Sequence, residues 1–329
     1  MTHPRDMLGF EGGEGPEGAF LDALQRGRLH HAWLLTGPEG VGKATFAYRA
    51  ARRLLGAAPD PQAGLLGAQA DDPVTRQVAA QSHPDLLVLQ RDLGDSKARR
   101  YITVEEARKL PEFFSTTPAS APYRVAIIDA ADDLNINAAN AVLKTLEEPP
   151  ERGVLFLVSH APGGLLATIR SRCRRLAFAP WPLERVASFV AERTGLPTAD
   201  AERLARISKG APGKALSLAI EGALTVDDAA RDLLRSLPKG DEAAFLALAE
   251  SFRGGQGARR FELLFERLSE QVRDMTVESA TAGHTEDLDR WAQAWERLVA
   301  IPHEVEAVNL DRADAFWTAI GDLRAAARA

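Results

Sequence analysis

Short apolar runs alternate with segments of helical periodicity through the first half of the chain. Five of these runs have the length and the aliphatic content of buried strands; they cover residues 31–36, 85–90, 123–130, 153–159 and 174–179. Strands that are apolar along their whole length and are separated by helices are typical of a parallel sheet covered on both faces. We therefore predict an α/β domain over residues 1–180, built on a five-stranded parallel sheet.

Local signals place two helices and one insertion in this domain. Thr103 stands three residues before Glu106, which is the spacing of a capping box and predicts a helix that begins at residue 104. The segment 137–148 has helical periodicity and stops before two prolines that cannot continue a helix. Residues 56–82 are rich in Ala, Gly, Gln and Pro, and we predict a long irregular insertion there, with no chemistry that we can name.

Beyond residue 182 the strand pattern disappears. Residues 181–222 hold three helical patterns, each followed by a glycine as helix ends often are, and predict a small helical domain. Residues 223–329 are helical throughout, with breaks at 254–257 and 281–285, and predict an all-α domain. Its apolar positions recur at helical spacing and suit a bundle core better than a binding stripe; they include Phe261, Leu264, Phe265 and Leu268.

Composition narrows the functional classes. A chain of 329 residues with 45% hydrophobic and 26% charged residues suits two or three globular domains. Its apolar runs are far shorter than the roughly 20 residues of a membrane helix, and the N-terminus lacks the pattern of a secretory signal, so we expect a cytoplasmic protein. One cysteine, Cys173, excludes an internal disulfide and a Cys-rich zinc site, and the histidines show no metal-ligand spacing. The net charge of −6 argues against bulk attraction to nucleic acid; the densest basic run is 170–175.

The run "TGPEGVGKAT", residues 36–45, is the strongest candidate for chemistry. It lies between a predicted strand and a predicted helix, so Gly37, Gly40 and Gly42 would let backbone N–H groups surround phosphate oxygens. Lys43 would add a positive charge beside the phosphates. The alternative is a tight strand-to-helix turn that binds no ligand.

The residues that complete a magnesium-dependent site are missing. Ala44 stands where a hydroxyl normally joins the Mg²⁺ shell, and Thr45 is turned about 100° around the helix, so it could touch a phosphate without replacing that ligand. After the third strand, Asp129 is followed by Ala130 instead of a second acid that could polarise water. We interpret Asp132 and Asp133 as helix-starting or solvated acids.

Four motifs in this order resemble the AAA+ clamp-loader subunits of bacterial DNA polymerase III, most of all the delta-prime type: "GRLHHAWLLTGPEGVGKAT", "HPDL", "NAANAVLKTLEEPP" and "LLATIRSRC". The resemblance covers about residues 8–222. It implies an AAA+ P-loop domain over 1–180, a lid domain over 181–222 and a helical collar for oligomerisation over 223–329.

The resemblance also implies roles for individual residues. Arg172 would be an arginine finger that reaches the γ-phosphate bound by a neighbouring subunit, and Ser159 would occupy the polar position that senses nucleotide or only caps its loop. The neighbouring arginines Arg170, Arg174 and Arg175 would contact protein or DNA, or be solvated. Asp129 would be what remains of the acidic pair.

Three departures from active relatives predict no intrinsic ATPase activity. They are Ala44, Ala130, and Gly213 with Lys214 where a lid arginine is expected. The cysteine cluster of many relatives is absent too, so we expect no zinc, no other metal and no required cofactor. Binding of ATP or ADP at the degenerate loop stays open, with weak, metal-poor binding as the hypothesis.

We thus predict a non-hydrolysing, delta-prime-like subunit of the polymerase holoenzyme. Its partners would be gamma/tau-like and delta-like subunits, bound through the collar and the AAA+ face, with the sliding clamp and primer-template DNA in the assembly and no membrane. One alternative is an active AAA+ ATPase, either a clamp-loader motor or a DNA-remodelling helicase. Another is a phosphate-binding regulator unrelated to replication, which leaves the motifs after the P-loop unexplained.

Overall fold

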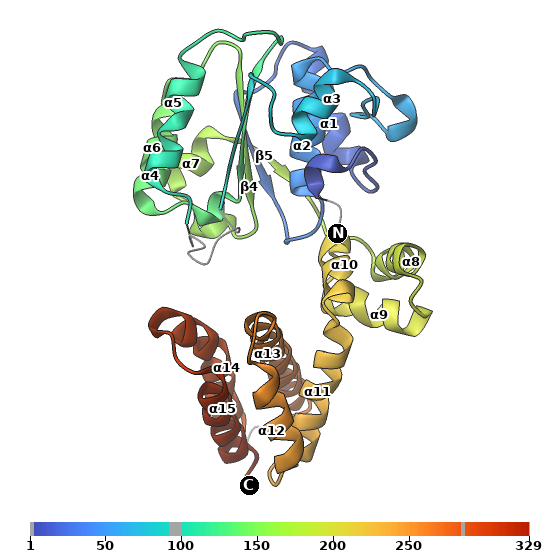
Figure 1. Ribbon diagram of the computed structural model, residues 1–329, viewed down its shortest axis with the longest axis vertical. Helices are drawn as coiled ribbons and strands as arrows, with labels where there is room; N and C mark the ends of the chain where they lie inside the picture. The colour runs from blue at the N-terminus through green and yellow to red at the C-terminus, as the bar shows by residue number, and fades with distance from the viewer. Residues whose placement is uncertain (1–2, 92–100, 284–286, 329) are drawn as a thin grey trace. The chain divides into compact units, whose positions relative to one another are not determined.

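The computed structural model describes residues 3–91, 101–283 and 287–328 (Figure 1). The chain divides into two compact units, Met1–Ser217 and Leu218–Ala329, and one helix, α10, crosses the division. The finer division at residues 180 and 222 stays a prediction.

The first unit holds the strands and the helices that surround them. Its elements are η1 (Pro4–Asp6), α1 (Glu14–Gln25), β1 (Ala32–Thr36), α2 (Lys43–Leu55), η2 (Pro61–Ala63), α3 (Pro73–Ala79), β2 (Leu86–Gln90), α4 (Val104–Ala107), α5 (Lys109–Phe114), β3 (Arg124–Asp129), η3 (Ala131–Asp133), α6 (Ile136–Glu147), β4 (Gly153–Ser159), η4 (Pro162–Gly164), α7 (Ala167–Arg172), β5 (Arg174–Ala177), α8 (Leu183–Thr194), α9 (Thr198–Ile207) and α10 (Pro212–Ile220).

The sheet is parallel and has the strand order β2-β3-β4-β1-β5, so the predicted five-stranded parallel sheet is confirmed. Each predicted strand agrees with the structure to within two residues. Thr36 pairs with Ser159 in register, and Gln90 pairs with Asp129. The carboxyl ends of β1, β2, β3 and β4 therefore meet at one edge of the sheet, where open α/β sheets commonly bind ligands.

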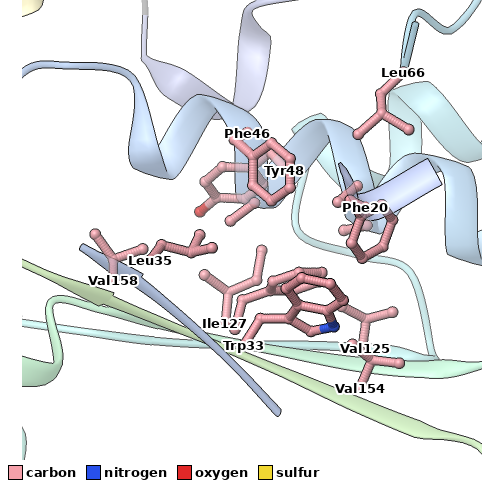
Figure 2. Close-up of a cluster of buried hydrophobic side chains, with 14 of the residues drawn as sticks. Phe20, Trp33, Leu35, Phe46, Tyr48, Leu66, Val125, Ile127, Val154 and Val158 are labelled. Carbon is pink, nitrogen blue, oxygen red and sulfur yellow. The ribbon is translucent and has the colours of Figure 1, made fainter. Parts of the chain in front are cut away.

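Helices cover both faces of the sheet: α1, α2 and α3 lie on one face and α4, α5, α6 and α7 on the other (Figure 1). Figure 2 shows Phe20 and Phe46 over the strands that carry Trp33 and Val125. The Phe20 and Trp33 rings meet edge to face, with centroids 5.2 Å apart, and both side chains are fully buried. Aromatic burial of this kind contributes strongly to stability. This pair holds α1 against β1, and Phe46 of α2 packs on Phe20 with ring centroids 5.7 Å apart.

The capping box predicted at Thr103 is present. Its hydroxyl accepts a hydrogen bond from the Glu106 amide, and the Glu106 carboxylate accepts one from the Thr103 amide. The helix begins at Val104 as predicted, but it stops at Ala107, and α5 follows from Lys109.

The prediction of an irregular insertion over residues 56–82 is wrong in part. Residues 73–79 form helix α3, which begins after Asp72. The Asp72 carboxylate accepts hydrogen bonds from the amides of Val74 and Thr75, and Pro73 occupies the first helical position. An acid followed by proline is a helix-start signal, so the sequence itself carries the evidence for this helix.

A buried ion pair holds the rest of the insertion. Arg49 of α2 and Glu17 of α1 pair at 2.6 Å, with exposed fractions of 1% and 2%. The Arg49 guanidinium also donates to the carbonyl of Ala63, and the Glu17 carboxylate accepts from the amide of Leu66. Leu66 itself is buried in the core. The insertion is therefore an ordered loop anchored to two helices.

The second unit is all-α, as predicted for the C-terminal region. After the end of α10 it contains α11 (Ala223–Ser236), α12 (Glu242–Ser251), α13 (Gly257–Thr281), α14 (Leu288–Val308) and α15 (Arg312–Ala327). Its core confirms the predicted stripe, whose four members are at most 2% exposed. The break predicted at 254–257 separates α12 from α13; that at 281–285 lies partly outside the described residues. None of the helices described here is long and apolar enough to cross a membrane.

Candidate functional site: a closed P-loop and an arginine cluster

The predicted phosphate loop has the expected strand–loop–helix setting. β1 ends at Thr36 and α2 begins at Lys43. Gly40 and Gly42 have φ angles of 79° and 99°, which side-chain-bearing residues rarely adopt. Glycine at these positions is therefore required by the backbone of the loop itself.

The Lys43 amine is turned back onto the loop. Its Nζ donates to the carbonyls of Gly37 and Pro38, both at 2.6 Å, and the residue is 3% exposed. Burial lowers the pKa of Lys43 to about 8, and the nearby Asp129 charge opposes that shift. The cation is held by the loop's own oxygens.

The N-terminal segment covers one side of the loop. The Thr45 hydroxyl, which we expect to be able to touch a phosphate, contacts the Met7 sulfur at 3.7 Å in this structure. A Cβ atom placed on Gly42 would lie 2.4 Å from the Phe10 ring. Buried Arg52 fastens this segment by donating to the Met7 carbonyl at 3.2 Å and to that of Arg5. The sequence carried no signal for this cover, because its hydrogen bonds join residues 38 to 47 positions apart.

The start of α10 covers a second side of the loop. The Gly213 amide donates to the Gly40 carbonyl at 2.8 Å. A Cβ atom on Gly40 would come within 2.3 Å of the Lys214 nitrogen. The two residues that stand at the expected lid-arginine position thus pack directly against the P-loop.

Asp129 lies at the carboxyl end of β3, as predicted. Burial raises its pKa to about 6, while the Lys43 charge opposes the rise. Ala130, which follows it, is 5% exposed and supplies no acid. A carboxyl group that resists ionisation, without a second acid beside it, is a poor magnesium ligand.

Asp132 is a helix-starting acid, as predicted, but its carboxylate has a structural role as well. It lies in the short helix η3, and its carboxylate accepts three hydrogen bonds: from the Ser159 hydroxyl at 2.9 Å, the His160 amide at 2.7 Å and the Ala161 amide at 3.1 Å. Ser159 is fully buried, so its hydroxyl joins β4 to the turn after β3. Asp133 forms an ion pair with Arg91 at 2.7 Å.

The residues around this loop do not fit a magnesium–nucleotide complex. Ala44 brings no hydroxyl and Ala130 no second acid, so two groups that would complete the Mg²⁺ shell are missing. Lys43 and Thr45 have their partners within the chain. Among residues 3–91, 101–283 and 287–328, no group of three or more acidic, histidine or cysteine side chains could hold a metal ion.

Arg172 belongs to a different part of the sheet. It is the last residue of α7, and its side chain is 37% exposed. Its Nη2 lies 3.0 Å from Oε1 of Glu147, the last residue of α6, and its Nη1 donates to the Thr168 carbonyl at 3.2 Å.

The other arginines of the cluster contact their own unit. Arg170 donates to the carbonyls of Pro162 and Gly163, and Arg175 donates to the Thr36 hydroxyl at 3.0 Å. The Arg174 guanidinium lies 4.9 Å from the centre of the Trp33 ring. Each therefore has a packing or hydrogen-bonding role that the sequence could not reveal.

Strand register separates Arg172 from the P-loop. β1 and β5 are parallel, with Trp33 opposite Arg174 and Thr36 opposite Ala177. The P-loop follows the carboxyl end of β1, whereas Arg172 precedes the amino end of β5. At about 3.3 Å per residue, the strand from Trp33 to the loop at Gly37 spans about 13 Å. Arg172 and the chain's own P-loop thus lie at opposite ends of the sheet.

A parallel sheet of this strand order, with a P-loop after its β1 strand and helices on both faces, defines an AAA+ P-loop domain. Comparison with known families makes the assignment specific. Residues 17–182 match the model of the family described as DNA polymerase III, delta subunit. The chain therefore belongs to this family, and it is a delta-prime-like member of the AAA+ clamp-loader subunits.

Individual relatives agree with this assignment. The chain is 39% identical over 148 residues to DNA polymerase III subunit delta′ of Pseudomonas aeruginosa, covering 45% of this chain and 43% of the relative. It is 31% identical over 196 residues to the Escherichia coli subunit delta′, covering 60% and 56%. Subunit gamma/tau of Mycobacterium tuberculosis is 28% identical over 347 aligned positions, covering 98% and 58%. The chain spans about half the length of the curated relatives it matches.

Proposed function

We propose that this chain is a non-hydrolysing, delta-prime-like subunit of the DNA polymerase III clamp loader and that Arg172 acts in trans on ATP bound by a neighbouring subunit. The observation that carries the proposal is the position of Arg172, which lies at the end of the sheet opposite the chain's own P-loop. A nucleotide that this guanidinium contacts must therefore belong to another chain.

The chain's own P-loop supports the same proposal. Met7, Phe10 and Gly213 lie against it, and its lysine is bonded to loop carbonyls. Together with Ala44 and Ala130, these contacts favour a subunit in which the P-loop stabilises the fold and does not support ATP hydrolysis. Weak, metal-poor binding of ATP or ADP remains our hypothesis for this loop.

Arginine suits the proposed chemistry. Its guanidinium is always charged, and its planar fork of N–H donors matches phosphate oxygens. In the transition state of phosphoryl transfer, the group would stabilise the charge on the γ-phosphate. Such fingers typically contribute a factor of 10³–10⁵ in rate, equivalent to roughly 4–7 kcal/mol.

The proposed partners follow from the family. We infer contacts with gamma/tau-like and delta-like subunits through the AAA+ face and the C-terminal helices, in an assembly that places a sliding clamp on primed DNA. In this assembly the chain would have a structural role, and Arg172 would be its one contribution to catalysis.

Arg172→Ala tests the proposal in a reconstituted loader. We expect the DNA-stimulated ATPase rate to fall while the complex still elutes as one assembly in gel filtration. Arg170→Ala on the same helix is the matched control, because Arg170 contacts only carbonyls of its own unit in the described structure, and it should leave the rate within twofold. Unchanged turnover with Arg172→Ala would overturn the finger assignment.

An active AAA+ ATPase is the second candidate, favoured by the alignment of 98% of the chain with a gamma/tau subunit. The purified chain alone would then hydrolyse ATP with Mg²⁺, and Lys43→Met would abolish that rate. We expect the isolated chain to show only background turnover that Lys43→Met does not change.

A further inference from the structure

We propose that Glu147 is a positioning residue for Arg172: its carboxylate, at the end of α6, holds the guanidinium in the orientation that a neighbouring subunit's phosphate meets. This inference rests on the proposed function of Arg172 as a finger. It adds a second residue, on a different helix, to the machinery that this chain would supply in trans.

Two anchors fix the Arg172 side chain. Nη2 lies 3.0 Å from Oε1 of Glu147, and Nη1 donates to the carbonyl of Thr168, one helical turn earlier. A guanidinium has five N–H donors, so these two contacts leave three for an incoming phosphate. The anchors thus orient the plane of the group and leave most of its donors for a ligand.

Because both side chains are exposed to water, this ion pair is better suited to orienting the Arg172 guanidinium than to stabilising the fold. The Arg172 and Glu147 side chains are 37% and 50% exposed, and ion pairs with such access to water contribute little to folding. The Arg49–Glu17 pair on the other face of the sheet, by contrast, has both side chains buried. A variant of Glu147 should therefore fold while its arginine samples other rotamers.

The orientation of the Arg172 guanidinium should affect kcat of the neighbouring ATPase site more than its affinity for ATP. The neighbouring subunit's own P-loop would bind ATP, so loss of Glu147 should leave the KM for ATP within twofold. Without Glu147, the Arg172 guanidinium would have to reach its catalytic orientation again at each turnover. This lowers kcat, because catalysis depends on placement to within about 1 Å.

The test measures the Arg172-dependent part of the loader's ATPase rate, which is the difference between wild type and Arg172→Ala. We expect Glu147→Ala to reduce this part by about 3–10-fold. Glu147→Gln keeps an oxygen that can accept the hydrogen bond, so it should give an intermediate value. Glu148→Ala removes the adjacent exposed carboxylate and should leave the rate unchanged.

A double variant separates positioning from a structural role. If Glu147 acts through Arg172, the pair Glu147→Ala and Arg172→Ala should be no slower than Arg172→Ala alone. A further loss in the double variant, or a wild-type rate for Glu147→Ala, would overturn the positioning role while leaving the finger intact. If Arg172→Ala itself changed nothing, both the proposed function and this inference would fall.

Discussion

The Gly213 amide donates a hydrogen bond of 2.8 Å to the Gly40 carbonyl, which joins the start of α10 to the P-loop. Both residues are glycines, and each would bring a new Cβ atom within 3.0 Å of the other segment. The close approach therefore depends on two small residues at once. A side chain as long as arginine at position 213 would have to leave this contact.

Gly40→Ala should destabilise the chain by about 1–3 kcal/mol, because alanine is strained at a φ of 79° and its Cβ would meet the Lys214 nitrogen. Gly195→Ala is the matched control. Gly195 has a φ of 70° but open space around it, so it carries the strain without the clash. Urea unfolding measures both, and equal losses would contradict a close contact between α10 and the P-loop.

Asp129→Asn should stabilise the chain at pH 8. Burial raises the pKa of this carboxyl from 3.8 to about 6, so the folded state binds its proton more tightly than the unfolded state. The free energy of unfolding therefore falls as pH rises from about 4 to about 6, then levels off. We expect asparagine to recover about 1–2 kcal/mol at pH 8 and less at pH 4.5. Equal gains at both pH values would argue against a raised pKa.

Asp132→Ala should cost about 2–4 kcal/mol, because three donors, including the buried Ser159 hydroxyl, lose their acceptor. Asp133→Ala removes the adjacent carboxylate, whose partner Arg91 is 43% exposed, and should cost less than about 1 kcal/mol. Urea midpoints of the two variants give the comparison directly. A larger loss for Asp133→Ala would reverse the roles that the structure assigns to the two acids.

Arg49→Met should cost about 3–5 kcal/mol by leaving the buried Glu17 carboxylate without its cation. It should also speed limited proteolysis within residues 56–72, since Arg49 and Glu17 both hold this loop. Arg26→Met breaks an exposed pair with Asp22 and should cost under about 0.5 kcal/mol. An intact loop in the Arg49 variant would contradict the anchoring role.

Much of the fold was predictable from local pattern. All five strands and the Thr103 capping box follow from residues near one another in the sequence, and so do the P-loop setting and the apolar stripe of α13. Helix α3 was equally local, since Asp72 and Pro73 mark its start, and composition misled the prediction there. The partners of Asp132 were not predictable, because Ser159 lies 27 residues away and only the sheet brings the two together.

The sequence by itself determined the family, the missing magnesium hydroxyl at Ala44 and the missing second acid at Ala130, because these depend on residue identity at fixed spacing. Only the tertiary structure decided what the remaining groups contact. In the folded chain, Lys43 donates hydrogen bonds to carbonyls of its own loop, and Met7 and Phe10 pack against the P-loop. Arg172 lies beside Glu147 at the opposite end of the sheet. The physical reason is that a side chain's hydrogen-bond partners depend on which strands and helices pack together, and this packing is a property of the whole domain.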